Sequence, residues 1–135
     1  MSQPALQSKD EIRSLAIEAT EQLLDRQGYA ALSTRKVAAA MGYTVGSLYL
    51  AFRNLDDLIL QVNARTLDAL LEAMDLAAAR AASPRDAIVH LAQAYIGFAQ
   101  QHQPRWNMLF EHRLQPDSRI PDWYEEKIYQ VFRVV

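Results

Sequence analysis

Residues 33–53, STRKVAAAMGYTVGSLYLAFR, constrain the fold of this chain more than any other stretch. Ser33 stands where a helix N-cap belongs, and Val37 and Met41 recur at the spacing of one helical face. Gly42 follows as a residue that can adopt the left-handed conformation and turn the chain sharply. The first half of this stretch therefore predicts a short helix with a defined start and end.

The second half predicts another short helix, which packs on the first. Thr44 offers an N-cap for it. An apolar stripe that can seat this helix consists of Leu48, Ala51 and Phe52. The residues left facing outward are Val45, Gly46, Ser47 and Tyr49. The small residues permit close approach to a DNA groove, and hydroxyl and N–H groups can reach phosphate oxygens. The alternative is a helical hairpin that serves only packing.

The charge distribution supports a nucleic-acid surface at this stretch. Residues 26–55 hold four basic side chains, Arg26, Arg35, Lys36 and Arg53, and no acidic one. The other residues carry 10 basic and 16 acidic side chains, so the whole protein is acidic. Positive charge is therefore concentrated where a polyanion would bind.

Residues 10–60 resemble the DNA-binding domain of the tetracycline-repressor (TetR) family of bacterial transcription regulators. The residues that carry this resemblance are Gly28-Tyr29, Ser33-Thr34-Arg35-Lys36-Val37-Ala38, Met41-Gly42, Gly46-Ser47-Leu48-Tyr49, Phe52, Asp57 and Leu58. The resemblance implies a three-helix head over residues 9–54, with its helix-turn-helix motif at residues 33–52. It further implies that a long helix joins this head to a C-terminal helical regulatory domain over residues 55–135.

The resemblance also implies which side chains meet DNA. Those expected to contact phosphates are Ser33, Thr34, Ser47, Tyr49 and Arg53, with Lys36 as a further DNA-binding residue. Those expected to face base edges are Arg35, Thr44, Val45 and Gly46. Because Val45 cannot hydrogen-bond, sequence choice would depend on Arg35, which could bond a guanine through two N–H groups. Family members often carry lysine at the position of Leu55, so that phosphate contact is absent here or supplied by Arg53.

Composition limits the possible classes of protein. Half of the 135 residues are hydrophobic, alanine and leucine dominate, and no strand pattern persists, so we expect an all-α protein. The absence of cysteine excludes disulfide scaffolds and thiolate metal sites and suits a reducing cytoplasm. No apolar run approaches the roughly 18 residues of a membrane span, and residues 1–8 read as a flexible arm. We therefore expect a cytoplasmic protein without membrane contact.

Two helices should frame the motif. Residues 9–27 place apolar side chains at intervals of three and four until Gly28 ends the helix. The positions expected in its buried face are Ile12, Leu15, Ala16, Ala19, Leu23 and Leu24. Asn54 is the expected N-cap of the second helix, which either runs unbroken to about Ala82, a length of about 40 Å, or kinks near residues 77–79.

The second half of the chain predicts three further helices. One starts at Ser83-Pro84 and runs to about Gln101. Its expected core face is Ile88, Leu91, Ala92, Tyr95, Ile96 and Ala99. Another covers residues 105–114, with Trp106, Leu109, Phe110 and Arg113 on one face. After a loop at residues 115–121, the last covers residues 122–135, with Trp123, Ile128, Val131 and Phe132 at helical spacing.

Eight of the twelve aromatic residues lie beyond residue 90, where a small-molecule effector would bind. Residues 88–114 resemble, more loosely, the ligand-sensing regions of some TetR subfamilies. The implied pocket is lined by Tyr95, Phe98, Trp106, Phe110 and Trp123, with His102 or His112 as a polar anchor. The competing interpretation is that this aromatic stripe is simply helical core.

No constellation predicts catalysis. The histidines at 90, 102 and 112 are twelve and ten residues apart, which puts no pair on adjacent helical turns, so neither a metal nor another cofactor is expected. No Gly-rich phosphate loop, nucleophile elbow or HExxH motif occurs. The protein is therefore predicted not to be an enzyme. The better rival to a DNA-binding regulator is a helical interaction module that does not recognise DNA sequence.

The resemblance implies a repressor that binds a double-stranded operator as a homodimer and is released by a small apolar or aromatic ligand. TetR-family dimers are held by two helices at the C-terminal end of longer chains. This sequence stops at Val135, within or just after a seventh helix. We therefore expect that this interface is missing, that residues 123–135 take over its role, or that the chain is a shortened form that associates weakly.

Overall fold

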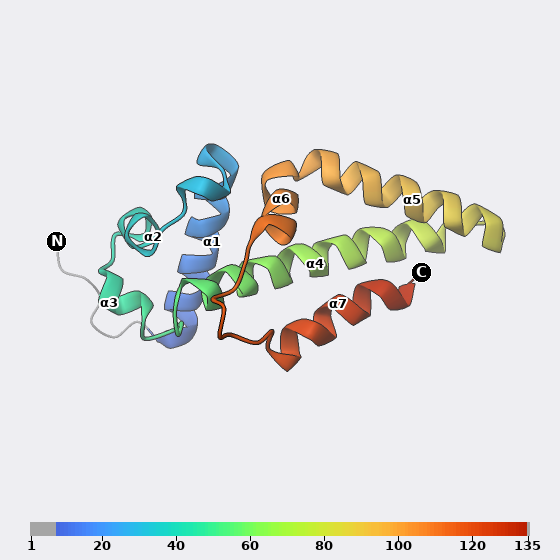
Figure 1. The fold of residues 1–135 in the computed structure, drawn as a ribbon. Helices are drawn as coiled ribbons and strands as arrows, with labels where there is room; N and C mark the ends of the chain where they lie inside the picture. Colours follow the sequence, from blue (N-terminus) through green and yellow to red (C-terminus); the bar gives the residue numbers. More distant parts are fainter. Residues whose placement is uncertain (1–7, 135) are drawn as a thin grey trace. The chain divides into compact units, whose positions relative to one another are not determined.

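The computed structural model describes residues 8–134, and throughout these residues the regular structure is helical (Figure 1). The all-α class predicted from the sequence is confirmed. The chain divides into two compact units, of which the first ends at Val62 and the second begins at Asn63. Of the predicted N-terminal arm, residues 1–7 lie outside the described part of the chain. Within residues 8–134, no helix combines the length and the apolar character needed to cross a membrane.

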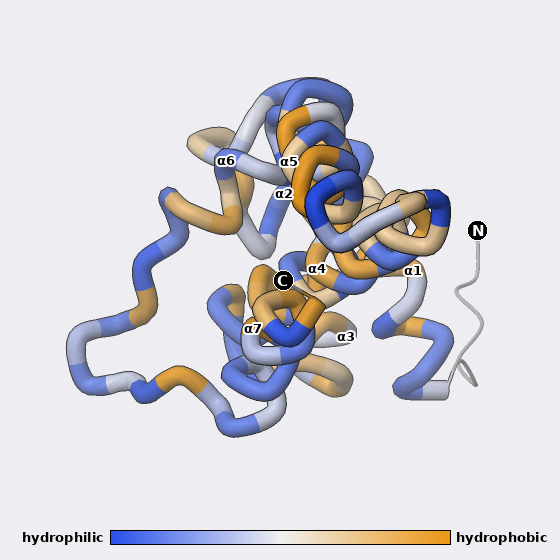
Figure 2. The backbone as a smooth tube through the Cα atoms, turned by 90° about the vertical axis from the view of Figure 1, so that its right-hand side faces the viewer, coloured by the Kyte–Doolittle hydropathy of each residue, from blue (hydrophilic) through white to orange (hydrophobic). Residues whose placement is uncertain are grey.

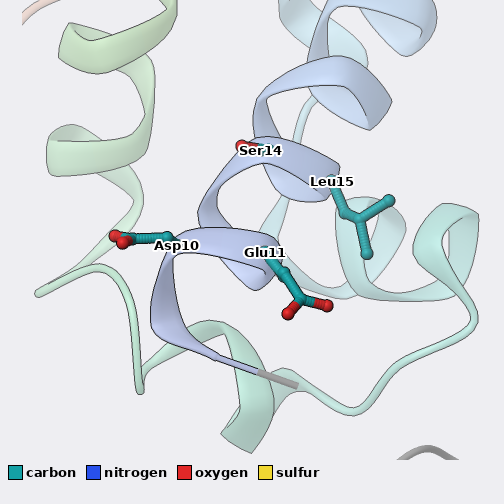
Figure 3. Close-up of a pocket in the computed structure, with 4 residues that line it drawn as sticks. All are labelled: Asp10, Glu11, Ser14 and Leu15. Carbon is teal, nitrogen blue, oxygen red and sulfur yellow. The ribbon is translucent and has the colours of Figure 1, made fainter.

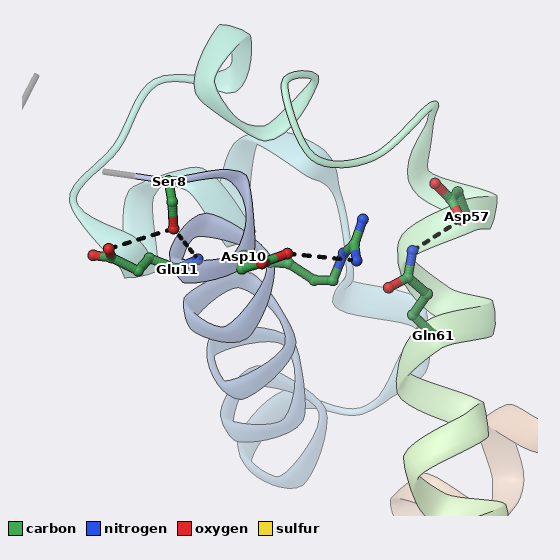
Figure 4. Close-up of polar contacts among 6 residues, drawn as sticks. Ser8, Asp10, Glu11, Asp57 and Gln61 are labelled. Carbon is green, nitrogen blue, oxygen red and sulfur yellow. Dashed lines mark hydrogen bonds and ion pairs between the residues drawn. The ribbon is translucent and has the colours of Figure 1, made fainter. Parts of the chain in front are cut away.

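The first unit begins with α1 (Lys9–Gln27), whose bounds match the prediction. Ser8 is its N-cap, because its Oγ accepts a hydrogen bond from the Glu11 N–H at 3.1 Å (Figure 4). Gly28, with a φ of 84°, ends the helix and leads into the single turn η1 (Tyr29–Ala31). α1 then packs against both helices of the motif, α2 (Thr34–Met41) and α3 (Val45–Leu48).

The buried face of α1 is wider than predicted and differs at one position. Leu15 was expected in the core but is 37 % exposed, and it borders an open surface hollow with Asp10, Glu11 and Ser14 (Figure 3). Ile17 is buried instead, together with the polar Thr20, whose hydroxyl donates to the Ala16 carbonyl at 2.7 Å. That hydrogen bond satisfies the hydroxyl inside the helix and lets a polar residue lie in the core.

A single helix of 25 residues, α4 (Leu55–Ala79), belongs to both units. At about 1.5 Å per residue it is about 37 Å long. Residues 77–79 bring no break, so the continuous alternative is confirmed, although the helix ends before the expected Ala82. After Ala79 the hydrogen bonds span three residues instead of four. They run from the Arg80 N–H to the Ala77 carbonyl at 3.3 Å and from the Ala81 N–H to the Ala78 carbonyl at 3.1 Å.

In the second unit, α5 (Pro84–Gln101) and α7 (Asp122–Val134) lie on opposite sides of α4 (Figure 1). The ammonium of Lys127 on α7 pairs with Asp68 of α4 at 2.8 Å. The side chains of Asn63 and Tyr124 form a second, buried link between these helices. Burial raises the pKa of Tyr124, and the hydrogen bond from Asn63 acts in the opposite direction.

The core face of α5 is rotated from the predicted one. Leu91 and Phe98 are buried, whereas Ile88 and Ile96 are 69 % and 56 % exposed. Both hydrophobic and hydrophilic residues occur along this helix (Figure 2). At helical spacing, the hydrophobic residues of its sequence are distributed around most of the helix. Such a pattern does not fix which side is buried, so the neighbouring helices decide it. The predicted start at Ser83 and end at Gln101 are confirmed.

The predicted buried faces of the last two helices also differ from the observed ones. α6 (Gln103–Glu111) buries Met108 completely, while Phe110 is 61 % exposed. It begins two residues earlier than predicted, because Pro104 suits a first helical turn, and it ends before the predicted Leu114. In α7 the buried positions are Tyr124 and Val131, whereas Trp123 and Phe132, both expected at helical core spacing, are exposed.

Candidate nucleic-acid interface

The first helix of the motif has the predicted caps. Ser33 has an extended backbone, and its Oγ accepts from the Lys36 N–H at 3.1 Å. Gly42 ends α2 in the left-handed conformation, with φ 75° and ψ 26°. The next N–H, that of Tyr43, bonds to the Ala38 carbonyl at 2.9 Å and closes the turn. The sharp connection predicted at Gly42 is therefore present.

The second helix of the motif is shorter than predicted. α3 has four residues and does not extend to Phe52. Its N-cap is Thr44, whose Oγ1 accepts from the Ser47 N–H at 3.2 Å. Residues 49–51 continue as a turn, in which the Ala51 N–H bonds to the Leu48 carbonyl at 3.0 Å. Gly46 contributes to this shortness, because glycine is among the weakest helix formers.

The apolar stripe keeps its predicted function despite the short helix. Leu48 is 2 % exposed and Phe52 is 4 % exposed, so both anchor this segment in the core of the first unit. Tyr49 and Leu50, between them, are 52 % and 59 % exposed. This segment therefore has one side buried in the core, formed by Leu48 and Phe52, and one side exposed to solvent, formed by Tyr49 and Leu50.

The residues predicted to bind DNA are accessible in the first unit. Those that are exposed are Arg35, Lys36, Thr44, Gly46, Tyr49 and Arg53, and those that are half-buried are Ser33, Thr34, Val45 and Ser47. Within residues 8–134, no carboxylate pairs with the guanidinium of Arg35. The charge of Arg35 is therefore available to an external anion.

Three polar residues that the sequence did not assign to this surface hold parts of it in place. Gln27 accepts from the Lys36 ammonium, with Oε1 and Nζ 3.5 Å apart. Asp57 accepts from the backbone N–H of Arg53 at 2.9 Å. It also accepts from the Gln61 amide at 3.1 Å (Figure 4). The spacing of Asn54 and Asp57 is a capping signal that could have revealed the second of these contacts. The contact of Gln27 depends on how α1 packs on α2, which no local pattern reports.

Most of the side chains predicted to bind a ligand form one aromatic cluster in the second unit. Trp106 is at its centre, with ring centroids 4.9 Å from Tyr95, 6.2 Å from Phe98 and 5.2 Å from Phe110. His102 joins through Phe98 at 4.6 Å. An open hollow borders Tyr95 and Trp106, with the amides of Gln100, Gln103 and Asn107 around it.

The other predicted ligand-binding positions lie elsewhere in the second unit. Trp123 has its ring contact with Tyr124, the next residue of its own helix, at 5.7 Å. His112 is half-buried at the C-cap of α6. In the described part of the chain, no three His, Asp or Glu side chains are grouped so that they could hold a metal ion.

Residues 16–62 match the profile of the family described as "Bacterial regulatory proteins, tetR family". The first unit therefore contains a segment of the TetR family. The matched residues run from the middle of α1 to the end of the first unit and include the whole motif. No curated protein matches the sequence significantly.

Solved structures show the same fold over nearly the entire chain. A protein of unknown function from Rhodococcus sp. RHA1 has a TM-score of 0.78 at 21% identity, over 98% of this chain and 67% of its own. A TetR family transcription regulator from Marinobacter aquaeolei has a TM-score of 0.64 at 20% identity, over 93% and 66%. The TetR family transcriptional regulator PfmR from Thermus thermophilus has a TM-score of 0.60 at 22% identity, over 88% and 69%. The chain therefore spans about two thirds of the length of these structures, and its fold is that of TetR-family regulators.

Proposed function

We propose that this protein is a sequence-specific DNA-binding transcriptional regulator of the TetR family that acts as a repressor in the cytoplasm. The observation that carries the proposal is the exposed side of α2 and α3. It combines the guanidinium of Arg35 with hydroxyl groups at the start of α3, in a stretch without acidic residues. A negatively charged, groove-shaped partner fits such a surface better than a protein partner does.

Each side chain has a proposed part in this contact. Phosphate oxygens would be bound by Ser33, Thr34, Lys36, Ser47, Tyr49 and Arg53. Base edges would be met by Arg35, Thr44, Val45 and Gly46. The Oγ of Ser33 already accepts the Lys36 N–H, so its hydroxyl hydrogen remains available for donation to a phosphate. The hydroxyl oxygens of Thr44 and Ser47 lie 3.0 Å apart and share one hydrogen bond, so one of their two hydroxyl hydrogens remains available to DNA. The hydrogen bond to Asp57 fixes the backbone of Arg53 and so positions its side chain.

A DNA titration tests the proposal. The native fragment is the region upstream of the protein's own gene, and the control is a scrambled fragment of equal length, each at low and physiological salt. We expect tighter binding to the native fragment at both salt concentrations, because base contacts persist when phosphate contacts weaken. Equal, salt-sensitive binding to both fragments would leave a basic surface without sequence readout. Failure to bind either fragment would favour an interaction module.

We further propose that two copies bind one pseudo-palindromic operator. A single α2–α3 unit reaches few base pairs, and two related units one helical turn apart read twice as many. The exposed apolar side chains of α7, namely Trp123, Tyr129 and Phe132, could contribute to contact between copies. In the same titration, saturation at two chains per operator is the expected stoichiometry.

A small apolar or aromatic effector is the proposed signal, and the aromatic cluster around Trp106 is its proposed site. Since α4 extends through both units, it is the natural mechanical link to the DNA-binding surface. An effector can release the operator only if it binds two conformers of the protein with different affinities. The regulator is thereby proposed to lose DNA affinity when the effector is bound.

Tryptophan fluorescence tests the proposed effector site. In a screen of aromatic and fatty compounds, a ligand bound at the cluster should change the emission of Trp106 and weaken operator binding. The variant Trp106→Phe should lose the fluorescence change, while Trp123→Phe, on α7, should retain it. The effector part of the proposal fails if every compound that binds leaves the operator complex intact.

The rival function is a helical interaction module, and one observation favours it. In the second unit, Ile88, Val89 and Ile96 of α5 expose about half of their surface or more. Such a face can bind a protein partner. The DNA titration separates the two functions, because a pure interaction module would not bind the native fragment more tightly than the scrambled one.

A further inference from the structure

A second hollow in the second unit differs in chemistry from the aromatic cluster. It lies where α4 ends and α5 begins, and no residue of the cluster contributes to it. Its lining residues are Ala73, Ala77, Arg80, His90, Gln93 and Ala94. The alanines offer a small, apolar floor, so the three longer side chains determine what the hollow can bind.

The ring of His90 is held in one orientation at this hollow. Its Nδ1 lies 3.2 Å from the carbonyl oxygen of Ala77, thirteen positions earlier in the chain. Because a carbonyl can only accept, Nδ1 must carry the hydrogen of this bond. The same carbonyl also accepts the N–H of Arg80 at 3.3 Å. The contact therefore fixes the ring between two helices and leaves Nε2 for another partner.

Among the residues that line the hollow, none is acidic and Arg80 carries a permanent positive charge. Arg80 is exposed, and no carboxylate among residues 8–134 pairs with its guanidinium. Asp86, at the start of α5, is not among the lining residues, and its carboxylate accepts from the Ala82 N–H at 3.4 Å. The C-terminal end of α4 adds a partial negative charge of about half an elementary charge, which is smaller than the full charge of one arginine. The side chains that line the hollow therefore favour an anion over a cation.

We propose that this hollow binds a small oxyanion, either a carboxylate or a phosphoryl group. The guanidinium of Arg80 supplies paired N–H donors that match two oxygens of such a group. The amide of Gln93 supplies a further donor, and the fixed ring of His90 forms the wall beside them. This inference does not depend on DNA binding or on the proposed aromatic effector, since it uses none of their residues.

A titration of the whole 135-residue chain followed by NMR tests the site. The probes are inorganic phosphate and acetate, added separately at constant ionic strength adjusted with sodium chloride. We expect saturable shifts in the Gln93 side-chain amide and the His90 ring, with His102 and His112 unchanged. The probe that saturates at the lower concentration identifies the preferred group, phosphoryl or carboxylate.

Matched variants decide whether the shifts arise at this hollow. Arg80→Gln should raise the half-saturating concentration roughly tenfold or more, because a charge-assisted pair is lost. Gln93→Leu should raise it by a smaller factor. Arg119→Gln removes another exposed arginine, in the loop before α7, and should leave the titration unchanged. Shifts that stay linear with both probes, or equal titrations of the Arg80 and Arg119 variants, would overturn the proposal. Helical circular dichroism confirms that each variant is folded.

Discussion

Replacing Leu48 with alanine is expected to reduce the free energy of unfolding by about 2–5 kcal/mol and to abolish binding to the operator. Leu48 is 2 % exposed, so the change leaves a cavity in the core of the first unit. A helix of four residues has no stability of its own, and α3 therefore depends on this anchor for its position. Loss of the anchor would displace the residues proposed to meet base edges.

Leu50→Ala is the matched control for this experiment. It removes the same side chain two residues later, at a position that is 59 % exposed, and its effect on unfolding should stay within about 0.5 kcal/mol. Urea denaturation measures both variants, and the DNA titration is repeated on each. Equal stability of the two variants would mean that Leu48 does not seat α3 as the structure indicates.

The helix ends that carry a capping residue could be predicted because their signals are local. Ser33 and Ser83 each accept the backbone N–H three residues later, as expected of an N-cap. Gly42 has the left-handed conformation that its position in the motif required. These features depend on a few neighbouring residues, so a single sequence contains all the information that they need.

The buried faces of the later helices could not be predicted in the same way. Ile96 and Phe98 are both large and apolar, yet only Phe98 enters the core. In α5 the hydrophobic residues surround most of the helix, and the packing of α4 and α6 decides between them. The buried face of α1 was predicted more accurately, because its polar residues restrict which side can be buried. Even there, Ile17 is buried in place of the predicted Leu15.

The sequence predicted which residues form the candidate DNA surface, but not the contacts that hold those residues in place. Its residues are close together in sequence, so the motif alone indicated them. The supporting contact from Gln27 to Lys36 joins two helices, and only the folded first unit reveals it. The length of α3 was wrong for a related reason, since the turn at residues 49–51 is stabilised by burial of Leu48 and Phe52 on either side.

Arg35→Ala should weaken binding to the preferred operator by roughly 1–3 kcal/mol and relax the choice of sequence at one base pair. Arg35 is exposed near the start of α2, and its guanidinium can offer two N–H groups to one guanine. Competition binding with operator variants measures both effects. The variant should lose its preference at the position that Arg35 reads, and it should keep its preference at the other positions.

Arg35→Lys separates base reading from simple charge. Lysine keeps the positive charge but lacks the planar pair of donors, so binding to scrambled DNA should persist while the preference for the operator falls. Arg119→Ala, in the second unit, provides the control for loss of one exposed charge. If Arg35→Ala weakens binding to operator and scrambled DNA equally, Arg35 binds only phosphate. Sequence recognition would then depend on Thr44, Val45 and Gly46 at the start of α3, through groove shape and the thymine methyl group.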